Sequence, residues 1–412
     1  MAKKRAEGEA GNFVSEWFGH RVYPTVISSP EAIADQRAER CPFLSQATGE
    51  NRDCIKNVRS KGVCSVSCPS NGVRQDWLVC PYRALNPEIV TGAVRRLFGL
   101  AAHTSPFVTP AVNLVKDEVR TDIKQRLDAG QPVFTYFDEK MGGELSIPAT
   151  DKSPEFAFDV TIIEISLRGG VPEIGRFGIL EIQTTDFHGS YQGAVRNLKD
   201  GLRLHESTFA DALQKNQRWL SDGIEGPNIA NVFKRTFYQM MFKFQLGQHG
   251  RCAGCVLAIP QSVWDSWQRH LGSPQVKPEA DGTFSLLRPG QSRSADCPAW
   301  IFVFDADAGA ATTPSPIVVK RTIGTDAPSF SYWALEVAPE AALSNIDADA
   351  GFLASLSRRM KAVWPALAKA AIVENAPMKR RGKKEPIERM EELTEYEKPS
   401  ADVVKSDQPD TE

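Results

Sequence analysis

Two carboxylates and one amide are spaced in this sequence so that they could share a metal site. The segment 177–184 alternates and is rich in branched residues, which predicts a strand. On such a strand Glu181 and Gln183 are two residues apart and point to the same face. Asp159 lies in a second predicted strand, 158–165. If the strands are neighbours, the acids converge, and Mg²⁺ is the hard cation that suits them. The alternative is that they are ordinary charges on a solvated face.

A third acidic residue follows a predicted strand, Val133–Phe137, in the sequence MGGELSI. The two glycines free the backbone next to Glu144. Glu144 is therefore a candidate extra acid of the metal site. An exposed glutamate without a function is the alternative.

Five of the eight cysteines fall within forty residues, in a segment that is short of large apolar side chains. Such a segment buries little surface, and a tetrahedral site of four thiolates would supply the missing stabilisation. Four thiolates suit Zn²⁺ or a single iron ion, and a scatter of buried free cysteines is the alternative. Cys252 and Cys255, in RCAGC, are expected to be core thiols on a strand. The five clustered residues are Cys41, Cys54, Cys64, Cys68 and Cys80.

The composition is that of an ordinary soluble protein, and a cytoplasmic location is expected. Of the 412 residues, 42% are hydrophobic and 24% are charged, and the net charge is −2. No apolar run approaches the roughly 20 residues that span a bilayer. The N-terminal MAKKRAEGEA has no apolar segment behind its basic start, so a secretory signal is not expected. Any binding of nucleic acid must come from local basic clusters.

Helices and strands are expected to alternate along the chain. Apolar residues recur at helical spacing in 12–23, 114–127 and 352–372. Further strands are predicted at 255–259 and 300–304. The stretches 272–298 and 306–326 are rich in Pro, Gly, Ala and Ser and are expected to be loops.

The segment EGPNIANVFKRTFYQMMFKFQL is expected to form a helix after Pro227, with Asn228 as its cap. Apolar residues spaced three and four apart mark its buried side. The polar side could contact phosphates or base edges, and a solvated surface is the alternative. The residues assigned to this polar side are Lys234, Arg235, Gln239 and Lys243.

Long ordered motifs in this chain resemble those of rare-cutting type II restriction endonucleases related to NotI. They extend to about residue 304 and cover most of the folded chain. The resemblance implies an α/β (α+β) fold: the PD-(D/E)xK nuclease core, a mixed sheet flanked by helices, with an inserted Cys₄ metal-binding module. The motifs include NFVSEWFGHRVYP (12–24), CPFL (41–44), DWLVCPYRAL (76–85), GGELSI (142–147), SPEFAFD (153–159), LEIQTTDFHGSY (180–191), EGPNIANVFKRTFYQM (225–240), IPQSVWDSWQRHL (259–271) and AWIFVF (299–304).

The resemblance implies a catalytic triplet and two metal sites. Asp159, Glu181 and Gln183 take the catalytic positions, with glutamine where most of the superfamily has lysine. Mg²⁺ is then held by Asp159, Glu181 and the backbone carbonyl of Ile182. Cys68 has no counterpart in the family pattern. A structural iron ion, with zinc as the alternative, is bound by Cys41, Cys54, Cys64 and Cys80.

The implied activity is Mg²⁺-dependent cleavage of both strands of double-stranded DNA at a short palindromic site, leaving 5′-phosphates. The family suggests the GC-rich sequence GCGGCCGC, a homodimer, and a cognate DNA methyltransferase in the same restriction-modification system. Candidate DNA contacts are Glu155, Arg176, Lys234 and Arg235. The rival hypotheses are a non-catalytic DNA-binding protein on a nuclease fold and a structure-specific repair nuclease.

Four regions are predicted along the chain. Residues 1–10 are expected to be disordered, and 11–100 form an N-terminal region that contains the cysteine module at 41–80. Residues 101–374 form the nuclease core with its DNA-recognition elements. Residues 375–412 form a charged tail that has too few apolar residues to fold.

Overall fold

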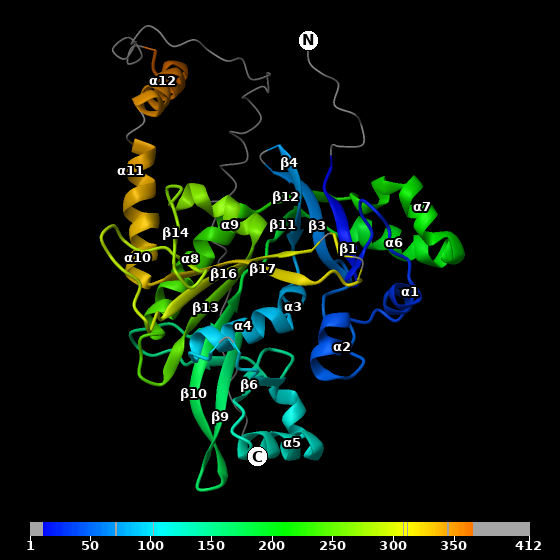
Figure 1. Cartoon of the computed structure of the whole chain (residues 1–412). Coiled ribbons are helices and arrows are strands. Elements are labelled where there is room, and N and C mark those ends of the chain that lie inside the picture. The colour runs from blue at the N-terminus through cyan, green and yellow to red at the C-terminus, as the bar shows by residue number, and fades with distance from the viewer. Residues whose placement is uncertain are drawn as a thin grey trace, which may run out of the picture. The chain divides into compact units, whose positions relative to one another are not determined.

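A mixed sheet of nine strands is the centre of the larger of the two units into which the chain divides, 1–344 and 345–412 (Figure 1). The computed structural model describes residues 11–365 except 71, 102, 308, 311, 344 and 345. The segments predicted to be disordered, 1–10 and 375–412, therefore lie outside the described residues. In order across the sheet the strands are β14 (Lys277–Pro278), β15 (Phe284–Ser285), β17 (Ile317–Thr325), β16 (Ala299–Ala306), β13 (Cys252–Pro260), β10 (Val171–Ile182), β9 (Val160–Arg168), β6 (Val133–Phe137) and β5 (Phe107–Pro110).

Continuous apolar runs form the central strands β13 and β16. They pair in parallel, and nearly all of their residues are buried. A run without alternation is expected of strands that are covered on both faces. β10 pairs in parallel with β13 and antiparallel with β9, and β9 and β10 together form a long ribbon (Figure 1). The strands predicted at Val133–Phe137, 255–259 and 300–304 are confirmed.

Helices cover both faces of this sheet, so the protein is a mixed α/β structure. α4 (Pro87–Leu97) packs against β10, where a Cβ on Gly178 would lie 2.7 Å from the Leu97 Cδ1. α8 (Ile229–Leu246) and α9 (Gln261–Trp267) pack on the other face. Alternate side chains of β10 point to opposite faces of the sheet. Leu180 packs in the apolar cluster that includes α4, and Ile179 packs in the cluster that includes α8.

A second sheet of four antiparallel strands adjoins the cysteine segment. Its order is β2 (His20–Arg21), β1 (Phe13–Trp17), β3 (Val63–Ser70) and β4 (Val73–Leu78). The helical spacing noted at 12–23 therefore gave a wrong prediction. Phe18 and Gly19 have positive φ angles of 50° and 80° and reverse the chain between β1 and β2. All five residues of β1 are buried, so its sequence shows no alternation.

The remaining elements connect and flank these sheets. Among the described residues, no helix is long and apolar enough to cross a membrane. The smaller unit contains α12 (Ile346–Val363). The larger unit also contains α1 (Pro30–Arg37), α2 (Pro42–Thr48), α3 (Pro81–Ala84), α5 (Asp117–Asp128), α6 (Gln192–Leu204), α7 (Phe209–Lys215), α10 (Ala327–Tyr332), α11 (Ala338–Leu343), β7 (Leu145–Ile147), β8 (Phe156–Phe158), β11 (Phe187–Gly189) and β12 (Ile224–Pro227).

Several element predictions hold, and others change. The helix after Pro227 is confirmed, since α8 begins at Ile229. Asn228 occupies the N-cap position, but its side chain makes no capping hydrogen bond. The loop predicted at 306–326 was wrong, because its IVVKRTIGT segment is rich in branched residues and forms β17. The other loop, 272–298, contains two short strands, β14 and β15.

Two helices begin at other residues than predicted. The helix predicted at 114–127 begins at Asp117, after a 3₁₀ turn over Ala111–Val115. The last helix, predicted at 352–372, begins earlier, at Ile346. Residues 366–372 of that prediction lie outside the described part of the chain.

Candidate functional site

Asp159 and Glu181 lie side by side on neighbouring strands of the main sheet. Leu180 of β10 pairs with Val160 of β9, and Asp159 lies in the bend just before β9. The Asp159 N–H donates to the Glu181 Oε1 over 3.2 Å. The Asp159 Oδ2 in turn accepts the N–H of Ile182 over 2.9 Å. The structure therefore brings the two acids together as predicted.

Glu181 and Gln183 both contact α8, which agrees with the prediction that they share one face. The Lys243 Nζ donates to the Glu181 Oε2 over 2.5 Å, and the Thr236 Oγ1 donates to the Gln183 Oε1 over 2.5 Å. Thr236 and Lys243 are seven residues apart on α8, which is about two helical turns. β10 ends at Ile182, so Gln183 follows the strand directly. A single helix therefore holds both side chains.

Lys243 is buried, so the prediction that it lies on the polar side of α8 was wrong. The residue is 2% exposed, and its Nζ lies 5.7 Å from the centre of the Phe158 ring. It follows Met240 by three residues and Thr236 by seven, which is the spacing of the buried stripe. A lysine is almost never fully buried without a partner. Its place on that stripe was the signal that could have linked it to Glu181.

Burial determines the charge preferences of the acids. Burial, and then the neighbouring Asp159, raise the pKa of Glu181 to about 8, against the opposing effect of Lys243. Burial also raises the pKa of Asp159, and the Ile182 N–H opposes that rise. The acids therefore favour their protonated forms unless a cation compensates their charge. Each Glu181 oxygen accepts one hydrogen bond and keeps a second lone pair that could bind a cation.

A cavity of about 310 Å³ extends from Asp159 to Cys80 of the cysteine segment, and neither Glu181 nor Gln183 is among its lining residues. Burial, and then Asp159, raise the pKa of Glu144, so the structure brings this third acid to the site as predicted. Asp138 also faces the cavity and accepts a hydrogen bond from the Tyr82 hydroxyl. Sequence reasoning missed Asp138, because a single aspartate after a strand forms no pattern. The lining residues include Cys80, Tyr82, Asp138, Glu144, Asp159 and Ile182.

Two of the predicted DNA contacts lie beside the strands. Glu155 accepts a hydrogen bond from the Ser146 Oγ over 2.5 Å and is close enough to Glu144 to raise its pKa. Arg176 pairs with Glu164 at 3.5 Å and lies 5.3 Å from the centre of the Phe98 ring, just after α4. Because α4 and α8 cover opposite faces of the sheet, the structure does not bring Arg176 together with the triplet.

The other two predicted DNA contacts are exposed on α8. Lys234 and Arg235 both lie on its solvent side, as predicted. The Arg235 Nη2 is 3.2 Å from the Asp186 Oδ2, and both side chains of this pair are well exposed. An exposed ion pair contributes little to stability. Arg235 could therefore exchange Asp186 for a phosphate group of a ligand at little cost.

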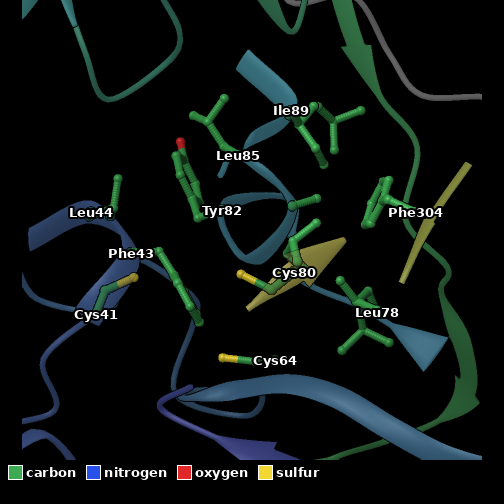
Figure 2. Close-up of a cluster of buried hydrophobic side chains, with 14 of the residues drawn as sticks. Cys41, Phe43, Leu44, Cys64, Leu78, Cys80, Tyr82, Leu85, Ile89 and Phe304 are labelled. Atoms are coloured by element: carbon green, nitrogen blue, oxygen red, sulfur yellow. The ribbon is translucent and has the colours of Figure 1, made fainter. Parts of the chain in front are cut away.

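The four predicted cysteine ligands are brought together in pairs. A short antiparallel bridge places Cys41 beside Cys54, and the β3–β4 hairpin places Cys64 beside Cys80. All four side chains are buried in the apolar cluster that includes α4. Figure 2 shows the sulfur atoms of Cys64 and Cys80 pointing to the same side of this cluster, towards Cys41.

The four thiols differ in their electrostatic environments. Burial raises the pKa of Cys41 to about 12. The hydrogen bond between Cys64 and Cys80 raises the pKa of Cys64 and lowers that of Cys80 to about 6, and Lys56 adds to the lowering. The Lys56 Nζ is itself fixed by the carbonyls of Val63 and Val79, at 2.7 and 2.9 Å. A set of buried sulfur donors beside a cation has the chemistry of a site for a soft metal ion.

Cys68 is separated from the other clustered cysteines. It packs with Trp77 in the apolar cluster that includes α8, whereas the four predicted ligands lie in the cluster with α4. This separation agrees with the prediction that Cys68 is not a ligand. Cys252 and Cys255 are buried on β13, as expected of core thiols.

Neither predicted metal site has a complete set of ligands in metal-binding geometry. In the described part of the chain, no three His, Cys, Asp or Glu side chains are arranged so that they could hold one metal ion. The donor chemistry nevertheless fits: carboxylate oxygens suit Mg²⁺, and thiolates suit iron or zinc. The metal assignments therefore stay predictions.

Comparisons with protein-family models and with curated proteins found no match to this chain. Its function is therefore inferred from the site and from the motifs.

Proposed function

We propose that this protein is a type II restriction endonuclease, a Mg²⁺-dependent nuclease of the PD-(D/E)xK superfamily. The observation that carries the proposal is the contact between Asp159 and Glu181 on neighbouring strands, with Gln183 on the same side as Glu181. The mixed sheet with helices on both faces is compatible with such a nuclease core. The resemblance of the motifs to those of NotI-related enzymes supports the same activity.

Oxygen donors at the strand ends would hold the catalytic metal ion. Asp159, Glu181 and the backbone carbonyl of Ile182 are donors of the type that Mg²⁺ prefers. When bound, Mg²⁺ neutralises charge and makes a bound water more acidic. Gln183 is neutral and held by Thr236, so it can orient an attacking water but adds no charge. Hydrolysis would leave a 5′-phosphate and a 3′-hydroxyl.

The proposal includes the substrate and the assembly. A palindromic site in double-stranded DNA suits a homodimer, because one two-fold axis relates both the half-sites and the active sites. GC-rich GCGGCCGC is the expected site, and a cognate methyltransferase would protect the host DNA in the cytoplasm. The iron or zinc ion of the cysteine cluster would be structural. It would order the wall formed by Cys80 and Tyr82 in the cavity shared with the acids.

Substitution of the acids tests this proposal. Asp159→Ala and Glu181→Ala should lower the rate of DNA cleavage in Mg²⁺ at least about 1,000-fold, because loss of the metal removes its charge stabilisation and its activated water. Both variants should still bind DNA in Ca²⁺. Glu173→Ala is the matched control, since Glu173 is an exposed acid on the same strand, β10. Full cleavage by either active-site variant would exclude the assignment.

A further inference from the structure

A buried ammonium group, that of Lys243, contacts one acid of the site directly. The Lys243 Nζ lies 2.5 Å from the Glu181 Oε2, and the two side chains are only 3% and 6% exposed. Burial raises the pKa of Asp159 and of Glu144, and the charge of the same ammonium opposes both rises. One residue of α8 therefore pairs with Glu181 and opposes part of the effect of burial on two further acids.

The Glu181 carboxylate is held from two sides. Its Oε1 accepts the Asp159 N–H over 3.2 Å, and its Oε2 accepts the Lys243 ammonium over 2.5 Å. A side chain with both oxygens bound keeps one orientation. A ligand that is oriented before the metal ion arrives loses less conformational freedom on binding it. Gln183 is fixed in a similar way by Thr236, so α8 supports both residues.

A purely structural role accounts less well for this ion pair. The desolvation cost of a buried pair often cancels its attraction, so two apolar residues of similar volume would stabilise the fold as well. The pair also lies beside Gln183, a neutral side chain at the position where most of the superfamily has a lysine. Lys243 brings a positive charge to the same cluster from a different element.

We propose that Lys243 is a positioning residue of the active site: its ammonium fixes the Glu181 carboxylate for metal binding and supplies from α8 the positive charge that Gln183 lacks. Lys243 is 2% exposed, so it acts through Glu181 and does not reach the DNA. This inference rests on the proposed nuclease activity.

The first test compares cleavage rates at saturating Mg²⁺. Lys243→Met should lower kcat about 100-fold, the effect expected when a catalytic ligand loses its position. Lys243→Arg, which keeps the charge and a hydrogen-bond donor, should recover at least about tenfold of that loss. Lys243→Gln replaces the methionine variant if the latter does not fold. Gln245→Met is the matched control, because Gln245 is exposed on the same helix, and it should cut like the wild type.

Two outcomes separate the inference from the proposed function. If the wild type does not cut DNA in Mg²⁺, both fail. If the wild type cuts DNA, two results would overturn the positioning role alone. One is a cleavage rate of folded Lys243→Met within about twofold of the wild-type rate. The other is a cleavage rate of Lys243→Arg no higher than that of Lys243→Met.

A second readout does not depend on activity. Lys243→Met should lower the midpoint of thermal unfolding of the metal-free protein, because it leaves Glu181 buried without its partner. Adding Glu181→Gln to that variant should recover about half of the loss or more, since the two side chains act as a pair. Additive losses in the double variant would show that they do not, and would overturn the inference.

Discussion

The acid site and the cysteine cluster adjoin the same cavity, but the protein compensates their buried charges differently. In the acid site, Lys243 and a backbone N–H hold the Glu181 carboxylate in place. In the cysteine cluster, burial raises the pKa of Cys41, and the hydrogen bond to Cys80 raises that of Cys64. The protein alone orders the Glu181 carboxylate, whereas Cys41 and Cys64 become ligands only when a metal ion displaces their protons. Metal removal should therefore disturb the cysteine cluster more than the acid site.

Serine substitutions in the cysteine cluster give the largest expected effect. Cys64→Ser and Cys80→Ser should each abolish the metal content, which is expected to be one iron or zinc ion per chain. They should also lower the free energy of unfolding by more than about 5 kcal/mol, since structural zinc contributes on the order of 10 kcal/mol to small domains. Elemental analysis and urea unfolding would measure the two effects.

Cys68→Ser is the matched control for these substitutions. Cys68 lies in the other apolar cluster, so this variant should keep the metal ion. It should cost about 1–3 kcal/mol, because a hydroxyl group replaces a buried thiol. Loss of the metal from Cys68→Ser would contradict the ligand set, and full metal content in Cys64→Ser would do so as well.

The raised pKa of Glu181 predicts that the stability of the acid site depends on pH. The folded pKa of Glu181, about 8, is raised above its ordinary value of 4.5. The folded state therefore binds more protons between these pH values, and the stability that Glu181 contributes is lost as the pH rises through about 8. In chelator-treated protein, Glu181→Gln should gain stability relative to the wild type as the pH rises from 5 to 9.

Thermal unfolding of both proteins across this pH range is the measurement. Mg²⁺ should flatten the decline of the wild type, since a divalent cation stabilises the ionised carboxylate. A constant difference between Glu181→Gln and the wild type would show that this carboxyl does not titrate with a raised pKa.

The exposed side of α8 gives the smallest expected effect. Lys234→Ala and Arg235→Ala should each weaken binding to DNA of any sequence. Each should also reduce the slope of log binding constant against log salt concentration by about 1, as expected of a lost phosphate contact. Their stability should change by less than about 0.5 kcal/mol, because both side chains are exposed. Titrations in Ca²⁺ at several salt concentrations would measure the effect. An unchanged salt dependence would place the DNA elsewhere.

The strand patterns predicted from the sequence that Asp159 and Glu181 lie close together, as they do in the structure. The alternation in 177–184 predicted that Glu181 and Gln183 share one side, and the second predicted strand brought Asp159 next to Glu181. The predicted strand bounds were wrong for two of the three residues, because Asp159 lies in the bend before β9 and Gln183 follows the end of β10. Lys243 could not be placed in the same way. Two phenylalanines flank it in MFKF, and a charged residue in a helix is most often exposed. Its burial depends on Glu181, a contact between segments 62 residues apart in the chain.

Other errors arose where a local pattern had more than one meaning. Apolar residues in 12–23 fit a helix as well as a hairpin whose strands are buried on both sides, and the turn at Phe18 and Gly19 decided between them. The density of cysteines indicated a cluster. It did not reveal that Cys68 faces a different apolar cluster from Cys64, four residues earlier on the same strand.

Sequencing the ends of digested DNA tests the central claim most directly. The purified wild-type protein would be incubated in Mg²⁺ with DNA of mixed sequence, and the ends of all fragments would be read. The proposal predicts discrete fragments whose 5′-phosphorylated ends all derive from one short palindrome. Intact DNA in Mg²⁺, or ends without a common sequence, would contradict it.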